Sequence, residues 1–533
     1  MKRIQYLGVL FLSIFLFSCQ EDFLETKPTA QVDKESATSS LDNCYAIING
    51  IHRFMYSSWD YQDEFGESTN MIKRDMMGED LCMTAAGNGW YNRLYQWSDH
   101  RNDLATSTEY SWKFYYRIIA NANTVIDALN TKFADKNDDP FFQEIMAQAL
   151  TYRAWAHFSV VQLYAKRYDP AKKGNNTQDG VILALSSEVK QRPRSTVEEV
   201  YTQINKDLDD AMALFTSSES SPAQVSDLSL HAAEAIKARV ALTTGEWQTA
   251  IDFAKKAKSA GSLFKPTDFT ANSGFTTIFS AYPGPGSEWI WGSQVKSDQS
   301  TYFASFFAYM SYNFSSTNIR TNPKTITKEL YDAMSATDAR KSIFSKDGYD
   351  IRDKAPNDVP WTALVASYET KKFRAVNAAD SRGDIAYIRV AEMYLIQAEA
   401  EARLTKDVEA QATLKALMVT RDPSYTTDKV GQALIDEILL QRRIELWGEG
   451  FRFTDLKRLN IGLTRVVTAV TDPAAPYKPQ VPYSKCGHIK TSYAGHHDPA
   501  LCTVVTVPAG DNRWQWFIPR AELNANKLVK QND

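Results

Sequence analysis

The sequence has no strongly charged, low-complexity or long apolar stretch, and these absences exclude several classes of protein. Its 60 lysines and arginines nearly balance 64 aspartates and glutamates, so it has no basic field that would attract nucleic acid. No block of like charge or biased composition is long enough to predict a disordered arm. The longest mostly apolar run, Ile4–Phe17, is shorter than the roughly 20 residues of a membrane-spanning helix. We therefore expect no nucleic-acid partner and no transmembrane helix.

The sequence also lacks the common catalytic signatures. It contains no Gly-x-x-x-x-Gly-Lys-Ser/Thr phosphate loop, no His-Glu-x-x-His and no Gly-x-Ser-x-Gly. A glycosidase, however, needs only two suitably placed carboxylates, and 64 acidic residues leave many candidate pairs. The missing motifs alone therefore do not separate a binding protein from a hydrolase.

The N-terminus has the proportions of a secretory signal. Lys2 and Arg3 form a basic start, and the apolar run that follows ends in Leu16-Phe17-Ser18-Cys19, which resembles a bacterial lipobox despite the bulky Phe17. Cleavage of residues 1–18 would leave Cys19 to carry lipid and anchor the chain to a membrane. Acidic Glu21 and Asp22 after that cysteine resemble a surface-export signal. The alternatives are a buried N-terminal helix and an ordinary secretory cleavage.

Cysteine is scarce, with four residues besides Cys19. These four are Cys44, Cys82, Cys486 and Cys502. In an exported protein, Cys486 and Cys502 could close a short disulfide loop. Three histidines inside that loop, at 488, 496 and 497, make zinc an alternative, but their spacing matches no standard zinc finger. We predict no metal site and no cofactor.

Most of the remaining chain has the apolar periodicity of amphipathic helices. Apolar residues recur at three- and four-residue steps, and Ser195 with Glu198 predicts a capping box at the start of one helix. The predicted helices are Trp112–Leu129, Phe141–Tyr164, Leu230–Thr243, Trp247–Ala260, Asp384–Leu404, Val408–Thr420 and Gln432–Trp447, with another that opens at Ser195.

Two of these helix pairs look like copies of one hairpin. The first runs from Ala235 through Gly245-Glu246-Trp247 to Ala257, and the second runs from Tyr394 to Leu417. Alanines at fixed offsets let paired helices approach closely, as in tetratricopeptide repeats. Ordinary alanine-rich amphipathic helices are the alternative explanation.

Two stretches between the helical blocks are rich in aromatic residues instead. Twelve of the forty residues from Phe275 to Phe314 are aromatic, without a sustained helical period and with Pro-Gly turns among them. Residues 54–97 mix aromatic residues with glycines and polar residues. The tail 460–512 is rich in Pro, Gly, Thr and Tyr, so we expect irregular structure there.

Four motifs, in order along the chain, resemble the SusD/RagB family of outer-membrane lipoproteins. They are Asp22-Phe23-Leu24-Glu25 with Pro28; Ala154-Trp155-Ala156-His157-Phe158 with Leu163-Tyr164; Arg442-Arg443-Ile444-Glu445-Leu446, Glu449-Gly450 and Phe451–Arg458; and Phe517-Ile518-Pro519 with Glu522-Leu523-Asn524 and Gln531-Asn532. Lys527 stands where the family often has proline, which is a small departure.

This resemblance implies a mainly α fold, in which a tetratricopeptide-like scaffold of helical hairpins carries long, irregular, aromatic-rich insertions. We expect residues 19–533 to form one SusD-like unit. Its scaffold helices would cover about 112–260 and 384–458, with insertions at about 50–105, 261–383 and 460–512. The resemblance also implies a non-catalytic protein, anchored on the outside of the outer membrane, that delivers oligosaccharide or peptide to a SusC-like TonB-dependent transporter.

The aromatic insertions are the best candidates for the ligand face. Sugar rings stack their C–H faces on aromatic rings, while amides and charged groups bind the hydroxyls. The residues with this mixture are Asn88, Trp90, Tyr91, Asn92, Arg93, Tyr302, Tyr309, Tyr312 and Asn313. The alternative for each aromatic residue is a place in the core, and Trp289 and Trp291 alternate as in a buried strand.

The arginine-rich block Arg442–Arg458 has both a functional and a structural interpretation. Its arginines with Glu445, Glu449 and Asp455 could form a phosphate or catalytic site, because guanidinium groups bind oxyanions in pairs of hydrogen bonds. We favour an ion network that holds the last scaffold helix in place. Alternatives for the whole protein are a secreted glycoside hydrolase or peptidase, and a repeat protein that binds only proteins.

Overall fold

The computed structural model describes residues 33–83, 88–220, 224–269, 278–346, 348, 367–465, 469–470, 483–484 and 505–533. The helices in these ranges are α2 (Lys34–Ala37), α3 (Leu41–Phe54), α4 (Glu67–Met76), α5 (Asn92–Tyr95), α6 (Thr106–Lys132), α7 (Pro140–Tyr164), α8 (Val197–Ser218), α9 (Leu230–Thr244), α10 (Trp247–Ala257), α11 (Phe307–Met310), α12 (Thr317–Thr321), α13 (Lys328–Asp332), α15 (Val390–Arg403), α16 (Asp407–Met418), α17 (Gly431–Glu445), α18 (Arg452–Leu459) and α19 (Arg520–Ala525). The strands are β1 (Leu81–Met83), β2 (Trp289–Ser293), β3 (Lys324–Ile326), β4 (Phe344–Ser345), β5 (Glu369–Thr370), β6 (Ile385–Arg389), β7 (Leu463–Arg465), β8 (Ala469–Val470), β9 (Tyr483–Ser484) and β10 (Val505–Val507).

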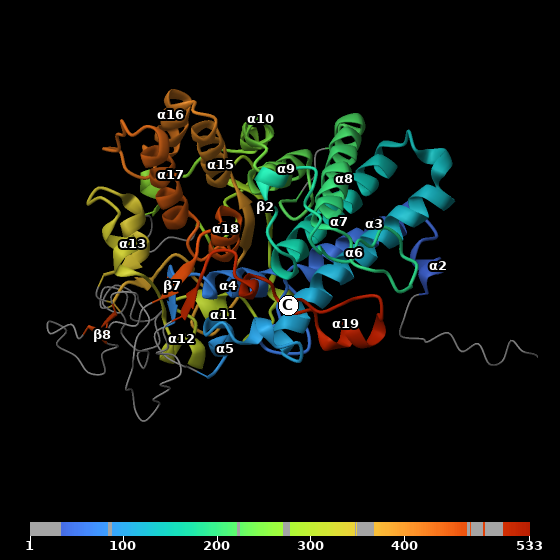
Figure 1. Ribbon diagram of the computed structural model, residues 1–533, viewed down its shortest axis with the longest axis horizontal. Helices are drawn as coiled ribbons and strands as arrows, with labels where there is room; N and C mark the ends of the chain where they lie inside the picture. The colour runs from blue at the N-terminus through green and yellow to red at the C-terminus, as the bar shows by residue number, and fades with distance from the viewer. Residues whose placement is uncertain are drawn as a thin grey trace, which may run out of the picture.

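The long helices form an array, which confirms the mainly α prediction. Helices α6 to α10 pack in chain order, and α15 packs on α10 and is followed by α16 and α17. Figure 1 shows these helices side by side across one half of the molecule, with the short elements α4, α5, α11, α12 and β7 below them. Successive helical hairpins that contact mainly their neighbours are the arrangement expected of tetratricopeptide-like repeats.

The strands are short and join distant parts of the chain. β1, β3, β5 and β4 make a small antiparallel sheet in that order, and β2 pairs with β6, β7 with β10 and β8 with β9. All five residues of β2 are buried, so the prediction of a buried strand at Trp289 and Trp291 is confirmed. The tail predicted to be irregular holds four of these short strands, β7 to β10.

Two local predictions were wrong. The helix predicted to start at Asp384 is strand β6 as far as Arg389, because this segment pairs with β2 across the molecule. The capping box of α8 consists of Thr196 and Glu199, one residue later than predicted. Ser195 instead exchanges backbone hydrogen bonds with the segment at Gly180, which keeps it out of the helix.

The arginine-rich block forms ion pairs that hold α17 and α18 to the rest of the fold, as predicted. Arg442 Nε lies 2.8 Å from Asp455 Oδ2, and Arg458 lies 2.7 Å from Asp455 and 2.8 Å from Glu399 of α15. The further pairs are Arg443–Asp80, at 2.5 Å, and Arg452–Glu79. These contacts fix both helices relative to α15 and to the segment that follows α4.

A fully buried ion network lies beside this block. Glu445 accepts hydrogen bonds from Arg389 at 3.1 Å and from Arg421 at 2.9 Å, and Arg421 also reaches Glu288 at 2.9 Å. Burial alone would raise the pKa of Glu445, but the guanidinium groups of Arg421 and Arg389 hold that pKa well below its usual range. Removing one member of such a buried network typically costs about 3–5 kcal/mol, because its partner is left charged and unpaired.

Lys457 connects three segments that are far apart in the sequence. Its ammonium group donates to the backbone oxygens of Gln162 and Ala165, at the end of α7, and to that of Trp514, at 2.6–2.7 Å. The last carbonyls of a helix have no partner within the helix, so a buried lysine can satisfy them. Burial lowers the pKa of Lys457 to about 7.

Candidate functional site

The two aromatic insertions meet at one end of the molecule. The ring of Tyr91, beside α5, lies 5.3 Å from that of Tyr309 in α11, and their planes are nearly perpendicular at 81°. Tyr309 in turn stacks on Phe65 at 5.3 Å. Figure 1 shows α5, α11 and α12 together on the side away from the tips of the scaffold hairpins. The structure therefore brings the two predicted ligand segments together through buried aromatic contacts.

Five of the predicted site residues are buried at this junction. Tyr309 and Asn313 are 0% exposed and Tyr312 is 1% exposed, while Tyr91 and Asn92 are also buried. The amide of Asn313 exchanges two hydrogen bonds of 2.9 Å with the backbone of Ala375, as a neighbouring strand would. In this conformation these side chains support the site from within and offer almost no surface to a ligand.

Tyr302 is instead half exposed in a strained backbone conformation. It is 51% exposed and has a φ angle of 52°, in the left-handed region that aromatic residues rarely adopt. Its ring contacts those of Phe303 at 4.3 Å and Phe314 at 5.6 Å, and its carbonyl accepts a hydrogen bond from Ser381. Such strain costs about 1–3 kcal/mol and is concentrated at functional sites.

The first insertion contributes a polar and aromatic edge. Asn88 and Arg93 are exposed, and Trp90 is partly buried against the core. Arg93 Nε is held 2.6 Å from Asp99 while the arginine side chain remains 65% exposed. This edge carries an exposed amide, a partly buried indole and a guanidinium held by Asp99.

Sequence reasoning missed two exposed rings. Tyr61 is 52% exposed and Phe303 is 38% exposed, and both lie in the aromatic-rich segments. Their exposure depends on the surrounding loops, so aromatic density was the only signal that could have indicated them. We use the name aromatic face for the exposed or partly exposed residues of the two insertions, which are Tyr61, Asn88, Trp90, Arg93, Tyr302 and Phe303.

A small cavity opens beside Tyr302. It has a volume of about 20 Å³ and lies between both insertions and the segment before β6. Phe65 and Tyr56 line one side, Thr301 and Ser305 line another, and Arg382 borders it. The ring and the cavity together provide a stacking surface beside polar groups, which is the chemistry that sugar recognition needs.

The acidic residues below the aromatic face are engaged in holding its loop. The carboxylate of Glu64 accepts from the backbone nitrogens of Asp60 and Tyr61, both at 3.2 Å. Burial raises the pKa of Asp63 and of Glu64, and the ammonium group of Lys73 opposes both shifts. Burial also lowers the pKa of Lys73 to about 8. These groups fix the turn that presents Tyr61.

Several predictions about anchoring, disulfides and metals fall outside the described residues. Residues 1–18, Cys19, Cys486, Cys502 and the three histidines between them lie there. Within the described ranges, no group of three or more His, Cys, Asp or Glu residues is placed to hold a metal ion. In the same ranges, no helix is both long and apolar enough to cross a membrane.

Two sequence profiles match this chain almost from end to end. One, described as starch-binding associating with outer membrane, matches residues 22–242, and the other, described as the SusD family, matches residues 287–533. The chain belongs to the SusD/RagB family. This membership supports a carbohydrate-binding role in nutrient uptake and association with the outer membrane.

Solved SusD-like structures have the same fold. A SusD-like carbohydrate-binding protein from Bacteroides vulgatus superposes with a TM-score of 0.72 at 22% identity, covering 92% of this chain and 97% of that one. A putative sugar-binding protein from Bacteroides vulgatus gives 0.69 at 22% identity, covering 92% and 98%. A SusD superfamily protein from Bacteroides thetaiotaomicron gives 0.68 at 20% identity, covering 93% and 100%. A search of the curated proteins finds no match.

Proposed function

We propose that this SusD-like protein binds an oligosaccharide at its aromatic face and delivers it to a SusC-like TonB-dependent transporter. It does so while held on the outer side of the outer membrane by lipid on Cys19, and it catalyses nothing. Family membership supports the role in carbohydrate uptake. The lipobox-like Leu16–Cys19 supports the anchor.

The exposed, strained Tyr302 carries the proposal for the site. An aromatic ring gains free energy when it leaves water, so a folded protein ordinarily buries it. Here the fold holds the ring of Tyr302 half exposed, at a backbone angle that costs energy, beside exposed Phe303. A sugar ring stacked on Tyr302 would cover this surface, with Asn88 and Arg93 available to bind hydroxyls.

The acidic groups near the aromatic face favour binding over hydrolysis. Glycoside hydrolysis needs two carboxyl groups about 5–9.5 Å apart on either side of the scissile bond. One candidate, Glu64, is only 6% exposed. One of its carboxylate oxygens already accepts hydrogen bonds from the backbone nitrogens of Asp60 and Tyr61 in its own loop. This arrangement suits a group that shapes the loop.

The experiment is a glycan-array screen of the chain from Gln20 onward, followed by calorimetry and product analysis on any glycan that binds. We expect binding without product. Replacing Tyr302 with Ala should weaken binding about tenfold or more, because stacking and packing against one aromatic ring are lost. The matched control is Tyr425→Ala, which removes a partly exposed ring from the loop between α16 and α17.

Three results would contradict the proposal in different ways. Product formation would assign the protein to the hydrolases. If Tyr302→Ala and Tyr425→Ala weaken glycan binding equally, the aromatic face is not the binding site. Binding of peptides without binding of any glycan would show that the transported ligand is a peptide and not a sugar.

A further inference from the structure

A second cavity lies in the scaffold, away from the aromatic face. It has a volume of about 70 Å³, opens to solvent, and lies between α4, α7, α9, β6 and the α17–α18 corner. Its partly exposed residues, among them Gln162, Thr243, Phe451 and Thr454, mark the side that reaches solvent. None of the residues that line it belongs to the aromatic face.

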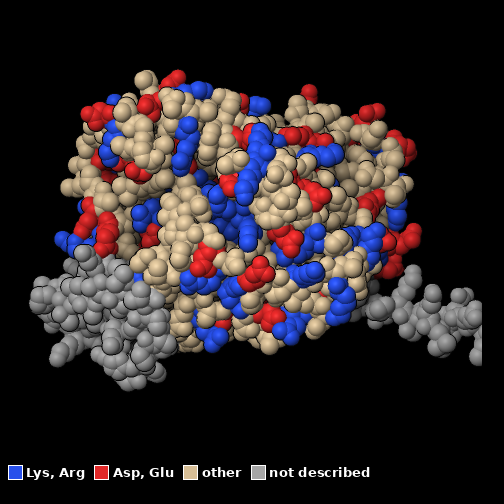
Figure 2. Space-filling view, viewed as in Figure 1, with Lys and Arg blue, Asp and Glu red and all other residues tan. Residues whose placement is uncertain are grey.

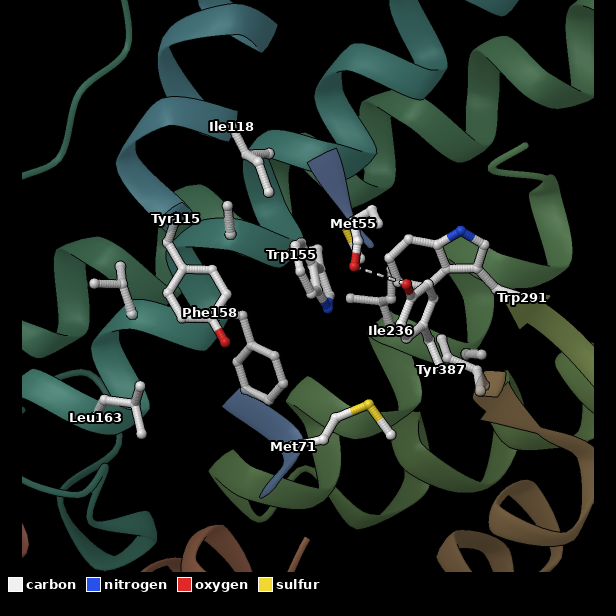
Figure 3. Close-up of a cluster of buried hydrophobic side chains, with 14 of the residues drawn as sticks. Met55, Met71, Tyr115, Ile118, Trp155, Phe158, Leu163, Ile236, Trp291 and Tyr387 are labelled. Atoms are coloured by element: carbon white, nitrogen blue, oxygen red, sulfur yellow. Dashed lines mark hydrogen bonds between the residues drawn. The ribbon is translucent and has the colours of Figure 1, made fainter. Parts of the chain in front are cut away.

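One wall of this cavity is apolar. Met71, Trp155, Phe158 and Tyr387 line it, and each is less than 8% exposed. Figure 3 shows the indole nitrogen of Trp155 turned toward the space between Phe158, Met71 and Tyr387. The hydroxyl of Tyr387 is already used, because it donates to the carbonyl of Met55 at 3.0 Å. A flat or compact ring could pack closely against this wall.

One hydrogen-bond donor on the cavity lining is buried without a partner in the part of the chain that the structure describes. It is Arg442 Nη1, although Arg442 Nε is bonded to Asp455. The indole nitrogen of Trp155 faces the same cavity. A buried donor without an acceptor costs about 1–3 kcal/mol, so Arg442 Nη1 favours an acceptor brought in from outside.

The charges around Arg442 leave one positive charge in excess. Arg442, Arg458 and Arg403 share only two carboxylates, those of Asp455 and Glu399. The other acids on the lining already have their own cations, in the pairs Glu67–Arg74, Glu392–Arg239 and Glu449–Arg389. Figure 2 shows lysine and arginine side chains gathered in the middle of this face, around the position of α18 in Figure 1.

We propose that this cavity binds a carboxylate carried on a compact ring, and that its natural ligand is an acidic sugar unit. The carboxylate would accept from Arg442 Nη1 and from Trp155 Nε1 and would neutralise the excess charge. The ring would pack against Trp155, Phe158 and Met71. The inference rests on the cavity alone and does not depend on sugar binding at the aromatic face.

Calorimetry on the chain from Gln20 onward tests this proposal with three probes: glucuronate, glucose and cyclohexanecarboxylate. We expect glucuronate to bind at least about tenfold more tightly than glucose, because only the acid uses the charged donor. Replacing Trp155 with Phe keeps the packing but removes the indole N–H, and should weaken glucuronate binding about three- to tenfold. Arg442→Gln should abolish it.

Two variants serve as controls. Trp516→Phe alters an equally buried indole whose Nε1 has no hydrogen bond among the described residues, but which does not line the cavity. It should leave glucuronate affinity unchanged. Tyr302→Ala should also leave it unchanged, which separates this cavity from the aromatic face. Circular dichroism establishes that each variant is folded, and Trp155→Phe tests the site even if Arg442→Gln does not fold.

Tight binding of cyclohexanecarboxylate as well as glucuronate supports the carboxylate site and assigns it to organic acids in general. Equal affinity for glucose and glucuronate overturns the proposal, because the excess charge would then play no part. Absence of binding by both acids would show that the cavity takes no carboxylate, and an unchanged affinity in Trp155→Phe would show that glucuronate binds away from this indole; either result overturns the proposal.

Discussion

At the scale of single residues, three histidines are buried with pKa values that burial lowers. The pKa falls to about 4 for His52 and to about 3 for His100 and for His157. His157 Nδ1 lies 3.0 Å from the carbonyl oxygen of Arg153, which can only accept, so Nδ1 carries the proton. Nε2 of His157 has no partner among the described residues, and the neutral ring fits its site.

These histidines should make the protein less stable in mild acid. A group whose pKa is lower in the folded state stabilises the fold above its unfolded pKa, and that stability is lost as pH falls. The window therefore runs from about pH 6.5 down to the folded pKa values of about 3–4. For His157 the loss is at most about 5 kcal/mol, at 1.36 kcal/mol per pKa unit. Urea unfolding from pH 8 to pH 4 measures it.

A substitution at His157 provides the check. His157→Gln removes the titrating ring, so the free energy of unfolding should fall less steeply between pH 6.5 and pH 4 than in the unaltered protein. His231→Gln is the control, because the side chain of His231 is 39% exposed. A slope that is unchanged in His157→Gln would refute the assignment.

The same scale shows why sequence reasoning found only part of the candidate site. It found the aromatic insertions but could not separate Tyr302, which is half exposed, from Tyr309 and Tyr312, which are buried. The insertions have no helical or strand period that would indicate an inner and an outer side. Whether a tyrosine there meets solvent depends on contacts such as the one between Tyr91 and Tyr309, which lie 218 positions apart in the numbering.

At the scale of elements, the two matching hairpins differ at their turns. Gly245 ends α9 with a φ angle of +76°, where glycine is the usual residue. The second hairpin has Thr405 at +58° in the turn between α15 and α16, and a β-branched residue is strained at that angle. The helix pairs were predictable from the spacing of their apolar residues. The strained turn is evident only from the φ angle of Thr405 in the structure.

Relief of this strain should stabilise the second hairpin. We expect Thr405→Gly to raise the free energy of unfolding by up to about 1 kcal/mol, since a left-handed conformation costs an L-residue about 1–2 kcal/mol and glycine loses more entropy on folding. Chemical denaturation measures the change. The reverse substitution, Gly245→Thr, should destabilise, because a Cβ there would lie 2.8 Å from Pro170 Cβ. A destabilised Thr405→Gly protein would contradict this view of the turn.

At the scale of the whole molecule, the C-terminal segment completes the scaffold. The side-chain amide of Asn532 donates to the carbonyls of Tyr164, at the end of α7, and of Trp516, both at 2.7 Å. Lys457 joins the same region to α18. The resemblance of the closing motif to the SusD/RagB family predicted the fold but not these contacts, because nothing in the local sequence indicates which distant carbonyl an asparagine will reach.

Loss of the Asn532 amide should weaken the whole fold. Asn532→Ala would leave two buried carbonyls without this donor, and we expect the free energy of unfolding to fall by about 2 kcal/mol. Urea unfolding measures the loss, and Lys530→Ala, at an exposed neighbouring position, is the control. Equal free energies of unfolding for the two variants would show that the hydrogen bonds of Asn532 do not stabilise the scaffold.

The hydrogen bond between Tyr164 and Asn532 can form only late in the synthesis of the chain. These two residues are 368 positions apart, so the end of α7 leaves the ribosome long before its partner exists. At about 5–20 residues per second, the wait is roughly 20–70 seconds. Until Asn532 is made, the chain lacks the segment that completes its scaffold, and a protein without this residue cannot form its hydrogen bond to the end of α7.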